Sequence, residues 1–361
     1  MRRSNLASSV LDTGAAMQGR ACGAAGVAYG EAVFNTSHTG YQEIVTDPSY
    51  QGQVVVLTCP HIGNVGASAY HAESACTHAA GIIARSCCRH HSGALAQRKL
   101  RSFLQSRRAI MLDAMDTRAL VLSLRSLGCN ACAISTASSC RAVLLSIARL
   151  CAMVPLGYAF VPCTRRFVVW RTRTMRLALS KPTCALFLDM GAKIGIPRRL
   201  ASEGAAVIAA PLCVRPHAAT ALRFSCVVAS NGPGNPRHTR SVAVGLASLH
   251  GLVPVMGVCL GHQALSLSMR CVTVRMPQGH RGSNHPVRDL CSSAVLVVAQ
   301  NHGYATDPNS LGDGVEVTHI SLIDDTIQGL RKRSARVQGM QGHPEGCSGP
   351  HDALRYIGLH A

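Results

Sequence analysis

The chain has 361 residues, 47% of them hydrophobic, and 36 Lys and Arg against 17 Asp and Glu give it a formal net charge of +19. This length predicts about two domains and is enough to bury a substantial core. A charge of this size is typical of nucleic-acid binders, but here the arginines are scattered, and aromatic residues, at 4%, are too few for a base-stacking surface. We therefore expect no nucleic-acid partner.

Cysteine is frequent in this chain, with 17 residues, and its distribution bears on the cellular compartment. Residues 1–5 carry two arginines and are followed by no apolar stretch of the kind found in a secretory leader. Many cysteines lie inside apolar runs, where a reduced thiol behaves as a small hydrophobic side chain. We therefore expect free thiols in a reducing compartment, the cytoplasm.

Two clusters contain the residue types of a metal site. Residues 87–91 read Cys-Cys-Arg-His-His, and Cys129 and Cys132 have the C-x-x-C spacing. A structural zinc site usually needs two such pairs at a suitable separation, which neither cluster provides on its own. We therefore expect no bound metal ion.

The first 135 residues read as a strand-rich domain with one clear helix. Residues 53–58 form an apolar run that predicts a buried strand. Asp116 has the residue type of a helix N-cap, and the leucines at positions 120, 124 and 127 recur at helical spacing behind it. The sequence therefore predicts an amphipathic helix after Asp116.

Residues 136–183 allow two interpretations, a connection between domains and a membrane anchor. An apolar run from Ala142 to Val161 is long enough for a membrane span, but Arg149 and Pro155 interrupt it. Several arginines follow, and such a positive flank is typical of the cytoplasmic side of a membrane anchor. We expect a divergent connection, packed in part as a helix, and regard a membrane anchor as the weaker alternative.

Residues 184–361 alternate between short apolar runs and helical patterns. Apolar runs at 185–188, 206–209 and 226–229 are separated by segments with helical spacing. Such alternation predicts a parallel sheet with helices on both faces. In sheets of this kind the functional site lies at the carboxyl ends of the strands, so the residues that follow each run are the candidates.

The most informative of these ends is the stretch from Gly257 to Gly261, which follows an apolar run at 252–256 and precedes a helical pattern. A cysteine with glycine two residues before it and two residues after it, on a sharp strand-to-helix turn, is the thiol form of a nucleophile elbow. The helix N-terminus behind the thiol favours its thiolate. Cys259 is therefore a candidate nucleophile for acyl transfer.

A nucleophilic thiol needs a base, and the base needs a group that orients it. The chain has 17 histidines, but His343 stands out because it begins the sequence His-Pro-Glu within Gln341–Glu345. In an extended stretch, residues two apart point to the same side. Glu345 is therefore expected to hold one ring nitrogen of His343 while the other faces Cys259.

Several further blocks connect the chain to a known family. These blocks are residues 30–43, 46–50, 60–66, 230–236, 282–287 and 300–304. With them, the order Cys, His, Glu, with the last two near the C-terminus, resembles class I glutamine amidotransferases, and the first third resembles the small, glutamine-hydrolysing subunit of carbamoyl phosphate synthetase. The resemblance covers roughly residues 10–135 and 184–356 and fails between them.

The resemblance implies an α/β fold and a set of site residues. It implies an N-terminal β/β/α domain in 1–135, a divergent linker in 136–183, and a class I amidotransferase domain with a mostly parallel sheet flanked by helices in 184–361. The implied catalytic residues are Cys259, His343 and Glu345. The implied glutamine-binding residues are Ser49, Gly232, Gly234, Leu260, Gln263, Asn301, Gly303 and Tyr304, with the backbone N–H groups of Gly232 and Leu260 as oxyanion donors.

The resemblance also implies a partner. The sequence contains no Walker motif or other glycine-rich phosphate loop, so this chain is expected to hold no cofactor. ATP and Mg²⁺ would bind in a large subunit that receives ammonia and builds carbamoyl phosphate from bicarbonate. Two alternatives stay open, an amidotransferase of another pathway and a decayed, non-catalytic scaffold subunit. Residues 30–66 argue against the first of these.

Overall fold

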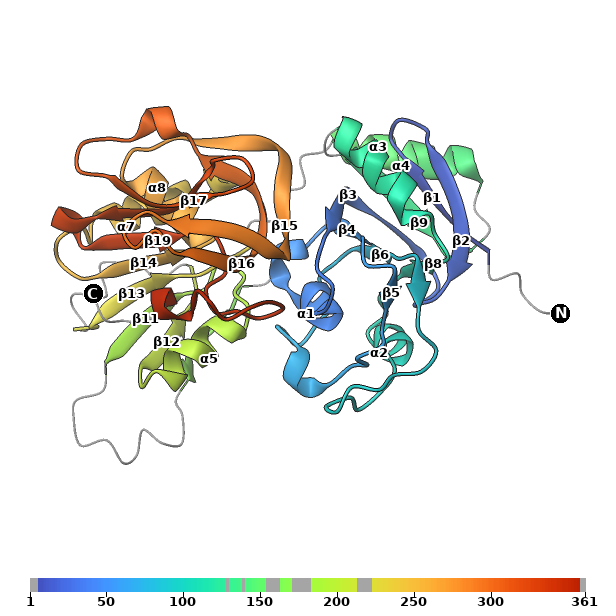
Figure 1. The fold of residues 1–361 in the computed structure, drawn as a ribbon, viewed down its shortest axis with the longest axis horizontal. Coiled ribbons are helices and arrows are strands. Elements are labelled where there is room, and N and C mark those ends of the chain that lie inside the picture. Colours follow the sequence, from blue (N-terminus) through green and yellow to red (C-terminus); the bar gives the residue numbers. More distant parts are fainter. Residues whose placement is uncertain are drawn as a thin grey trace. The chain divides into compact units, whose positions relative to one another are not determined.

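A computed structural model describes residues 6–127, 130–137, 140–153, 163–170, 183–212 and 223–357. The chain divides into two compact units, Met1–Leu156 and Gly157–Ala361, each with its own buried clusters. Figure 1 shows the elements of both units, coloured along the sequence.

The first unit is built on a closed barrel of seven strands in the order β1-β2-β8-β6-β4-β3-β9. The strands are β1 (Leu6–Leu11), β2 (Ala16–Ala21), β3 (Val27–Asn35), β4 (Gln53–Leu57), β6 (Gly81–Ile83), β8 (Met111–Asp113) and β9 (Asn130–Ser135). The run β3-β4-β6-β8 is parallel and the other pairs are antiparallel. The buried strand predicted at 53–58 is β4.

Alternation along β4 divides the core of this unit in two. Val54 and Val56 belong to a cluster that includes two leucines of α3 (Thr117–Leu127), whereas Val55 belongs to a cluster with Phe103 of α2 (Leu100–Ser106). This is the period-two pattern of a strand that is buried on both faces. A short helix α1 (Tyr41–Thr46), a pair of two-residue strands β5 (His61–Ile62) and β7 (Ser86–Cys87), and 3₁₀ turns at Pro48–Tyr50 and Ala69–His71 complete the unit apart from α4.

Helix α3 begins as the sequence predicts. The carboxylate Oδ1 of Asp116 accepts a hydrogen bond from the backbone N–H of Ala119 at 3.1 Å, which caps the first turn. Leu120 and Leu124 are buried, whereas Leu127, the last residue of the helix, is exposed.

The segment between the two predicted domains contains regular structure. Helix α4 (Arg141–Met153) packs on β1, β3 and β9 and buries Leu144 and Ala148 against Val10 and Ala133. The first unit therefore extends beyond residue 135. Among the helices of the described residues, none is long and apolar enough to cross a membrane, and residues 154–161 of the apolar run lie outside the described ranges.

The second unit is a ten-stranded sheet in the order β10-β12-β11-β13-β14-β19-β18-β17-β15-β16. The strands are β10 (Val168–Trp170), β11 (Cys184–Leu188), β12 (Ala206–Ala210), β13 (Cys226–Ala229), β14 (Val255–Val258), β15 (Thr273–Asp289), β16 (Val295–Thr306), β17 (Glu316–Ser321), β18 (Ile327–Lys332) and β19 (Val337–Met340). The neighbouring strands β12, β11, β13, β14 and β19 are parallel, as the alternation predicts. The strands at both ends of the sheet, β10 on one side and β18, β17, β15 and β16 on the other, pair antiparallel.

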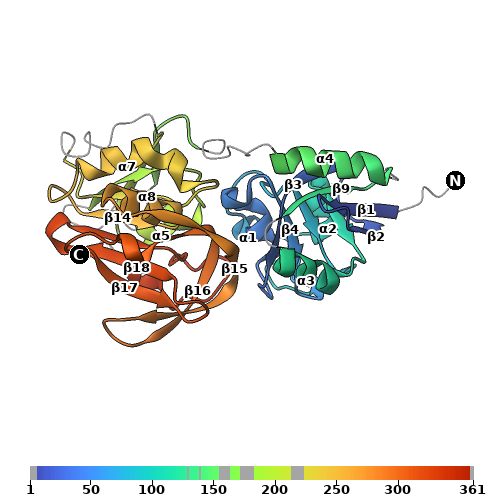
Figure 2. The same cartoon turned by 90° about the horizontal axis from the view of Figure 1, so that it is seen from above.

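Helices cover both faces of the parallel part of this sheet (Figures 1 and 2). Helices α7 (Arg240–Ala247) and α8 (Leu260–Ser268) pack together on one face, in a cluster with Val227 of β13. Helix α5 (Gly195–Ser202) packs on the other face, in a cluster with Val228. The sheet is therefore the middle layer of this unit, which also contains 3₁₀ turns at Pro236–Thr239, Pro308–Ser310, Arg333–Ala335 and Leu354–Ile357.

Candidate active site

The strand–turn–helix predicted around Cys259 is present, and its backbone is strained. Cys259 joins β14 to α8 with φ 53° and ψ −105°, a region that non-glycine residues rarely adopt. A Cβ added at Gly257 would lie 2.5 Å from the carbonyl group of Gly261, and one at Gly261 would collide with the carbonyl oxygen of Ala229. Both glycines are therefore needed for close backbone approach, and the turn points the buried thiol toward the carboxyl edge of the sheet.

Parallel pairing brings the other two triad candidates to the same edge. Strand β19 lies beside β14, and the backbone N–H of Cys259 donates to the carbonyl of Met340 at 2.9 Å. His343 follows β19, and its backbone N–H donates to the carbonyl of Ala299 on β16 at 2.9 Å. The segment that carries the predicted base is thus held between the end of β14 and β16.

The side chain of His343 is held by Glu345, as the His-Pro-Glu spacing predicts. Nδ1 of His343 lies 2.8 Å from Oε1 of Glu345, and Nζ of Lys193 lies 2.9 Å from the same oxygen. All three side chains are at least 96% buried. Nε2 of His343 makes no hydrogen bond within the described residues, so it is open toward a reaction partner.

The charges of this group determine its protonation. Burial and the Lys193 ammonium disfavour an imidazolium, but the Glu345 carboxylate and the Cys259 thiolate outweigh them and raise the pKa of His343 to about 10. Burial opposes ionisation of Glu345, yet Lys193 and His343 hold the pKa of that carboxyl well below its usual range. The arrangement therefore favours a charged carboxylate and a protonated imidazole beside the thiol.

Lys193 is the one member of this charged group that sequence reasoning did not predict. The chain has few lysines, and the structure buries this one to 97%. A buried lysine usually has an acidic partner. Nothing in the local sequence, however, indicates that this partner is Glu345, which lies 152 residues away.

The loop predicted to supply oxyanion donors lies against the elbow. A Cβ at Gly232 would collide with the carbonyl oxygen of Met190 and lie 3.0 Å from the side chain of Leu260, so Gly232 and Leu260 are neighbours. Oδ1 of Asn231 accepts from the backbone N–H of Lys193 at 3.0 Å, which ties the loop to the charged group. Gly234 lies two residues further on, with φ 98°.

Strand β16 and helix α8 bring four further predicted residues to Cys259. Sγ of Cys259 lies 3.6 Å from the carbonyl oxygen of Asn301, which is on β16 together with Gly303 and Tyr304. Nε2 of Gln263 donates to the carbonyl of Tyr304 at 2.9 Å. Residues 301–304 and Gln263 therefore line the same edge as the thiol.

Ser49 is the only predicted site residue in the first unit. It lies in the 3₁₀ turn Pro48–Tyr50, is buried, and donates its backbone N–H to Oδ1 of Asp47 at 2.8 Å. The other ten predicted residues all belong to the second unit, where the structure brings them to one edge of the sheet.

His262, close to the nucleophile in the sequence, has a structural role. It is fully buried on α8 and packs against Gly339 of β19, where a Cβ would lie 2.8 Å from its Nδ1. Burial lowers its pKa to about 4, so the ring is neutral near pH 7.

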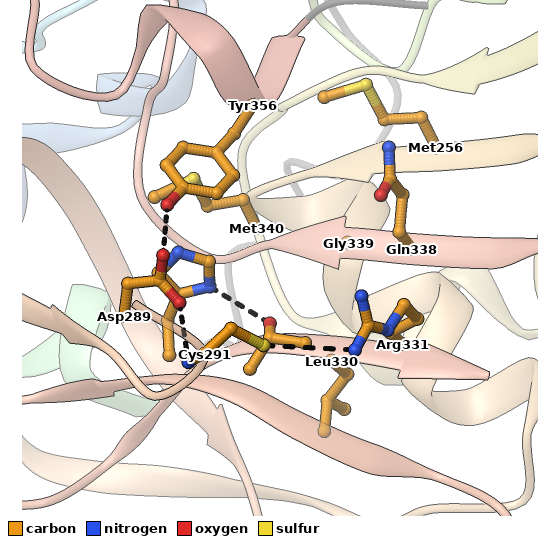
Figure 3. A pocket seen from close by; sticks show the side chains of 11 residues that line it. Met256, Asp289, Cys291, Leu330, Arg331, Gln338, Gly339, Met340 and Tyr356 are labelled. Carbon is orange, nitrogen blue, oxygen red and sulfur yellow. Dashed lines mark hydrogen bonds between the residues drawn. The ribbon is translucent and has the colours of Figure 1, made fainter. Parts of the chain in front are cut away.

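A separate cavity of about 160 Å³ lies in the second unit, away from the triad residues, none of which lines it (Figure 3). Its wall includes Met256, Gln338 and Arg331 from adjacent strands, and Tyr356 from the C-terminal 3₁₀ turn. Because Tyr356 donates its hydroxyl to Asp289 at 2.6 Å, this wall joins the C-terminal turn to the end of β15.

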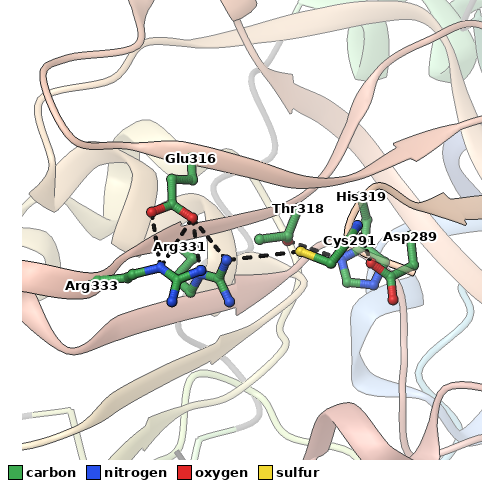
Figure 4. Close-up of polar contacts among 7 residues, drawn as sticks. All are labelled: Asp289, Cys291, Glu316, Thr318, His319, Arg331 and Arg333. Carbon is green, nitrogen blue, oxygen red and sulfur yellow. Dashed lines mark hydrogen bonds and ion pairs between the residues drawn. The ribbon is translucent and has the colours of Figure 1, made fainter. Parts of the chain in front are cut away.

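Asp289, which lines the cavity, and Glu316, on the neighbouring strand β17, each accept more than one hydrogen bond (Figure 4). Asp289 also accepts from the hydroxyl of Ser292 at 2.6 Å, and Glu316 pairs with Arg331 at 2.8 Å and with Arg333 at 3.1 Å. Burial opposes ionisation of Asp289, but these hydrogen bonds hold the pKa of its carboxyl well below the usual range. The network stabilises the charged form and fixes the strand ends, so its groups serve packing.

Comparisons with known proteins cover both units. A family model described as "Carbamoyl-phosphate synthase small chain, CPSase domain" matches residues 9–134, and one described as "Glutamine amidotransferase class-I" matches residues 186–356. Among curated relatives, the "Carbamoyl phosphate synthase small chain" of Vibrio cholerae is 37% identical, with 95% of this chain and 94% of that one covered. The proteins of the same name from Yersinia pseudotuberculosis and Escherichia coli are 38% and 37% identical, with 95% of this chain and 91% and 93% of theirs covered.

Proposed function

Because this chain belongs to the carbamoyl-phosphate synthase small chain family, we propose that it hydrolyses glutamine through a Cys259 thioester and delivers ammonia to a synthase partner. The observation that carries the proposal is the arrangement at the edge of the second sheet. There a strained elbow thiol lies near a buried histidine whose Nδ1 is held by Glu345 and whose Nε2 is open. This is the nucleophile, base and orienter of a cysteine acyl-transfer site.

The proposed reaction begins from an ion pair. The raised pKa of His343, about 10, keeps its imidazole protonated near pH 7, and the proposed nucleophile is the thiolate form of Cys259. The thiolate attacks the side-chain amide carbon of glutamine, and the amide oxygen becomes an oxyanion that accepts hydrogen bonds from the backbone N–H groups of Leu260 and Gly232. His343 then gives its proton to the departing nitrogen, which leaves as ammonia.

The second half of the reaction hydrolyses the thioester and releases Cys259. His343, now neutral, takes a proton from water, and the hydroxide that forms attacks the γ-glutamyl thioester. Glutamate leaves, and Cys259 returns to its thiolate beside the protonated imidazole. Glu345 keeps the ring oriented throughout, because it is buried and its Oε1 contacts Nδ1 of His343. Lys193 holds the same oxygen in place.

Glutamine recognition is assigned to the groups that surround the thiol. Both N–H groups of the Gln263 amide are used, by the carbonyl of Tyr304 and by Gln341, so its oxygen is the atom left to accept from the substrate's ammonium group. Asn301, Gly303 and Tyr304 would contact the amino-acid end of glutamine from β16, and Gly234 from the loop after β13. Ser49 would contribute from the first unit.

The partner is proposed from the same family membership. Ammonia would pass to a large subunit that binds ATP and Mg²⁺ and makes carbamoyl phosphate from bicarbonate, so this chain itself would need no cofactor. We propose a heterodimer in the cytoplasm that serves arginine and pyrimidine biosynthesis.

One assay with two nitrogen donors tests the proposal. In the reconstituted complex with a large subunit, Cys259→Ser should abolish carbamoyl phosphate synthesis from glutamine and leave synthesis from ammonium intact, because free ammonia bypasses the thioester. Equal loss with both donors would mean that Cys259 holds the fold or the interface. If the wild-type complex used only ammonium, the subunit would be a scaffold and the proposal would fail.

A further inference from the structure

The side chain of Gln341 lies beside the nucleophile, and the proposed reaction does not use it. Gln341 follows β19 directly, is fully buried, and donates its backbone N–H to the carbonyl of Gln328 at 2.8 Å. Its Nε2 lies 3.7 Å from Sγ of Cys259, within the range of a hydrogen bond to sulfur. A buried amide is usually retained for the hydrogen bonds it makes, and this one reaches the reacting atom.

The direction of the hydrogen bond to sulfur follows from a chain of partners. The carbonyl of Tyr304 can only accept, so the amide of Gln263 must turn its NH₂ group toward it, at 2.9 Å. The same NH₂ group lies 3.0 Å from the side-chain oxygen of Gln341. The oxygen of Gln341 is therefore occupied, and its NH₂ group is the end that faces the sulfur of Cys259. A flipped amide would place two NH₂ groups against each other.

We propose that Gln341 is a catalytic residue of this site, whose amide N–H donates to the sulfur of Cys259 and stabilises the thiolate. Gln263 is the positioning residue that keeps this donor in place. A hydrogen bond to the charged form of a group favours that form, and the sulfur carries its full charge before attack and again when the thioester is cleaved. The assignment to glutamine hydrolysis rests on the proposed function, whereas the effect on the thiolate does not.

The first test measures the thiolate itself. Its ultraviolet absorbance is followed against pH as the difference between each protein and its Cys259→Ser counterpart, which isolates this thiol from the other cysteines. Gln341→Met keeps the side-chain volume but removes the donor, and should move the midpoint upward by about one pH unit. Gln341→Glu keeps an acceptor for Gln263 but places an acceptor or a negative charge at the sulfur, and should move the midpoint further still.

A matched control variant separates the donor from the burial of an amide. Gln328→Met removes an equally buried glutamine of the adjacent strand, whose side chain bonds Gln300 at 2.9 Å and does not contact Cys259. It should leave the midpoint unchanged. A midpoint that is the same in wild type, Gln341→Met and Gln341→Glu would overturn the proposal, as would an equal shift in Gln328→Met.

The second test is glutamine hydrolysis. Gln341→Met should lower kcat about tenfold and change KM little, because the lost hydrogen bond is made to the nucleophile. A rise in KM with kcat unchanged would assign Gln341 to substrate binding and contradict the proposal. If the wild-type protein hydrolyses no glutamine, the proposed function fails on its own, and the thiolate midpoint still decides the role of Gln341.

A variant of the positioning residue covers the case in which Gln341→Met does not fold. Gln263→Met leaves Gln341 in place but frees its amide to rotate, so the thiolate midpoint should rise by less than in a folded Gln341 variant. An unchanged midpoint in a folded Gln263→Met would show that the orientation of the donor does not matter, and would count against the proposal.

Discussion

At the scale of single residues, charge organises the side chains at the sheet edge that holds Cys259. Glu345 shares one oxygen between His343 and Lys193, and Cys259 faces the same histidine. Because Lys193 lowers the pKa of His343 while Glu345 and the thiolate raise it, the histidine depends on its neighbours for its protonation state. Removal of one charge should therefore be visible at another residue.

Cys259→Ser should lower the pKa of His343, because a neutral hydroxyl replaces the thiolate that stabilises the imidazolium. The measurement is an NMR titration of histidine labelled in the ring. Since the folded pKa lies above the unfolded value of 6.5, the stability contributed by His343 is fully present below pH 6.5 and is lost as pH rises through about 10. Over that pH range, the free energy of unfolding of the Cys259→Ser variant should fall by less than that of the wild type. An unchanged His343 titration would contradict the charge coupling described here.

The sequence predicted those residues of the site whose roles follow from local sterics. Gly257 and Gly261 were predictable because a tight turn around Cys259 leaves no room for a Cβ, and Glu345 because it lies two residues from His343. Lys193 and the contact of Gln263 with Gln341 were not predictable, because these contacts join segments far apart in the chain. Such contacts depend on the strand order, which local patterns do not determine.

At the scale of elements, the elbow depends on the loop after β13. The backbone of α8 begins so close to the end of β13 that only a glycine fits at position 261, and Gly261 therefore fixes how Cys259 meets the oxyanion loop. The obstructing atom is a backbone carbonyl, which cannot rotate away as a side chain could.

Gly261→Ala should destabilise the protein by about 2 kcal/mol or more, because the new methyl group must displace the carbonyl of Ala229. Urea unfolding followed by circular dichroism measures the change. Gly312→Ala is the matched control, since its nearest neighbour would lie 3.8 Å from the added Cβ, and it should change stability by less than about 0.5 kcal/mol. Equal effects of the two substitutions would refute the steric argument.

Among the elements, the parallel strands were predicted better than the antiparallel ones. Strands β11 to β14 read as short, continuous apolar runs, because both of their faces are buried. Strand β15 carries glycine, proline and histidine and changes register twice along β16, so it has no clean period of two. Helix α4 was uncertain for another reason, since its apolar residues continue into a longer run that also suited a membrane span.

At the scale of the whole molecule, the buried residues form separate cores in the two units. The clusters around β4 and α4 contain residues of the first unit alone, and those around β13 and β14 contain residues of the second unit alone. Each unit therefore has the means to fold as a domain.

The two units should unfold in two calorimetric transitions. Gly261→Ala should lower the temperature of one transition and leave the other unchanged, because position 261 belongs to the second unit. Differential scanning calorimetry of the full chain, wild type and variant, makes the comparison. A single transition whose calorimetric and van't Hoff enthalpies agree would show that the two cores are coupled into one cooperative unit.

The two units end their sheets differently. The first closes its strands into a barrel, whereas β10 pairs only with β12 within the described residues and leaves Val168, Val169 and the adjacent Phe167 exposed. An open strand edge with apolar side chains is a template for pairing with a second chain. When the protein is expressed at high concentration, self-association should therefore begin at this edge. Val169→Lys should then reduce the formation of inclusion bodies.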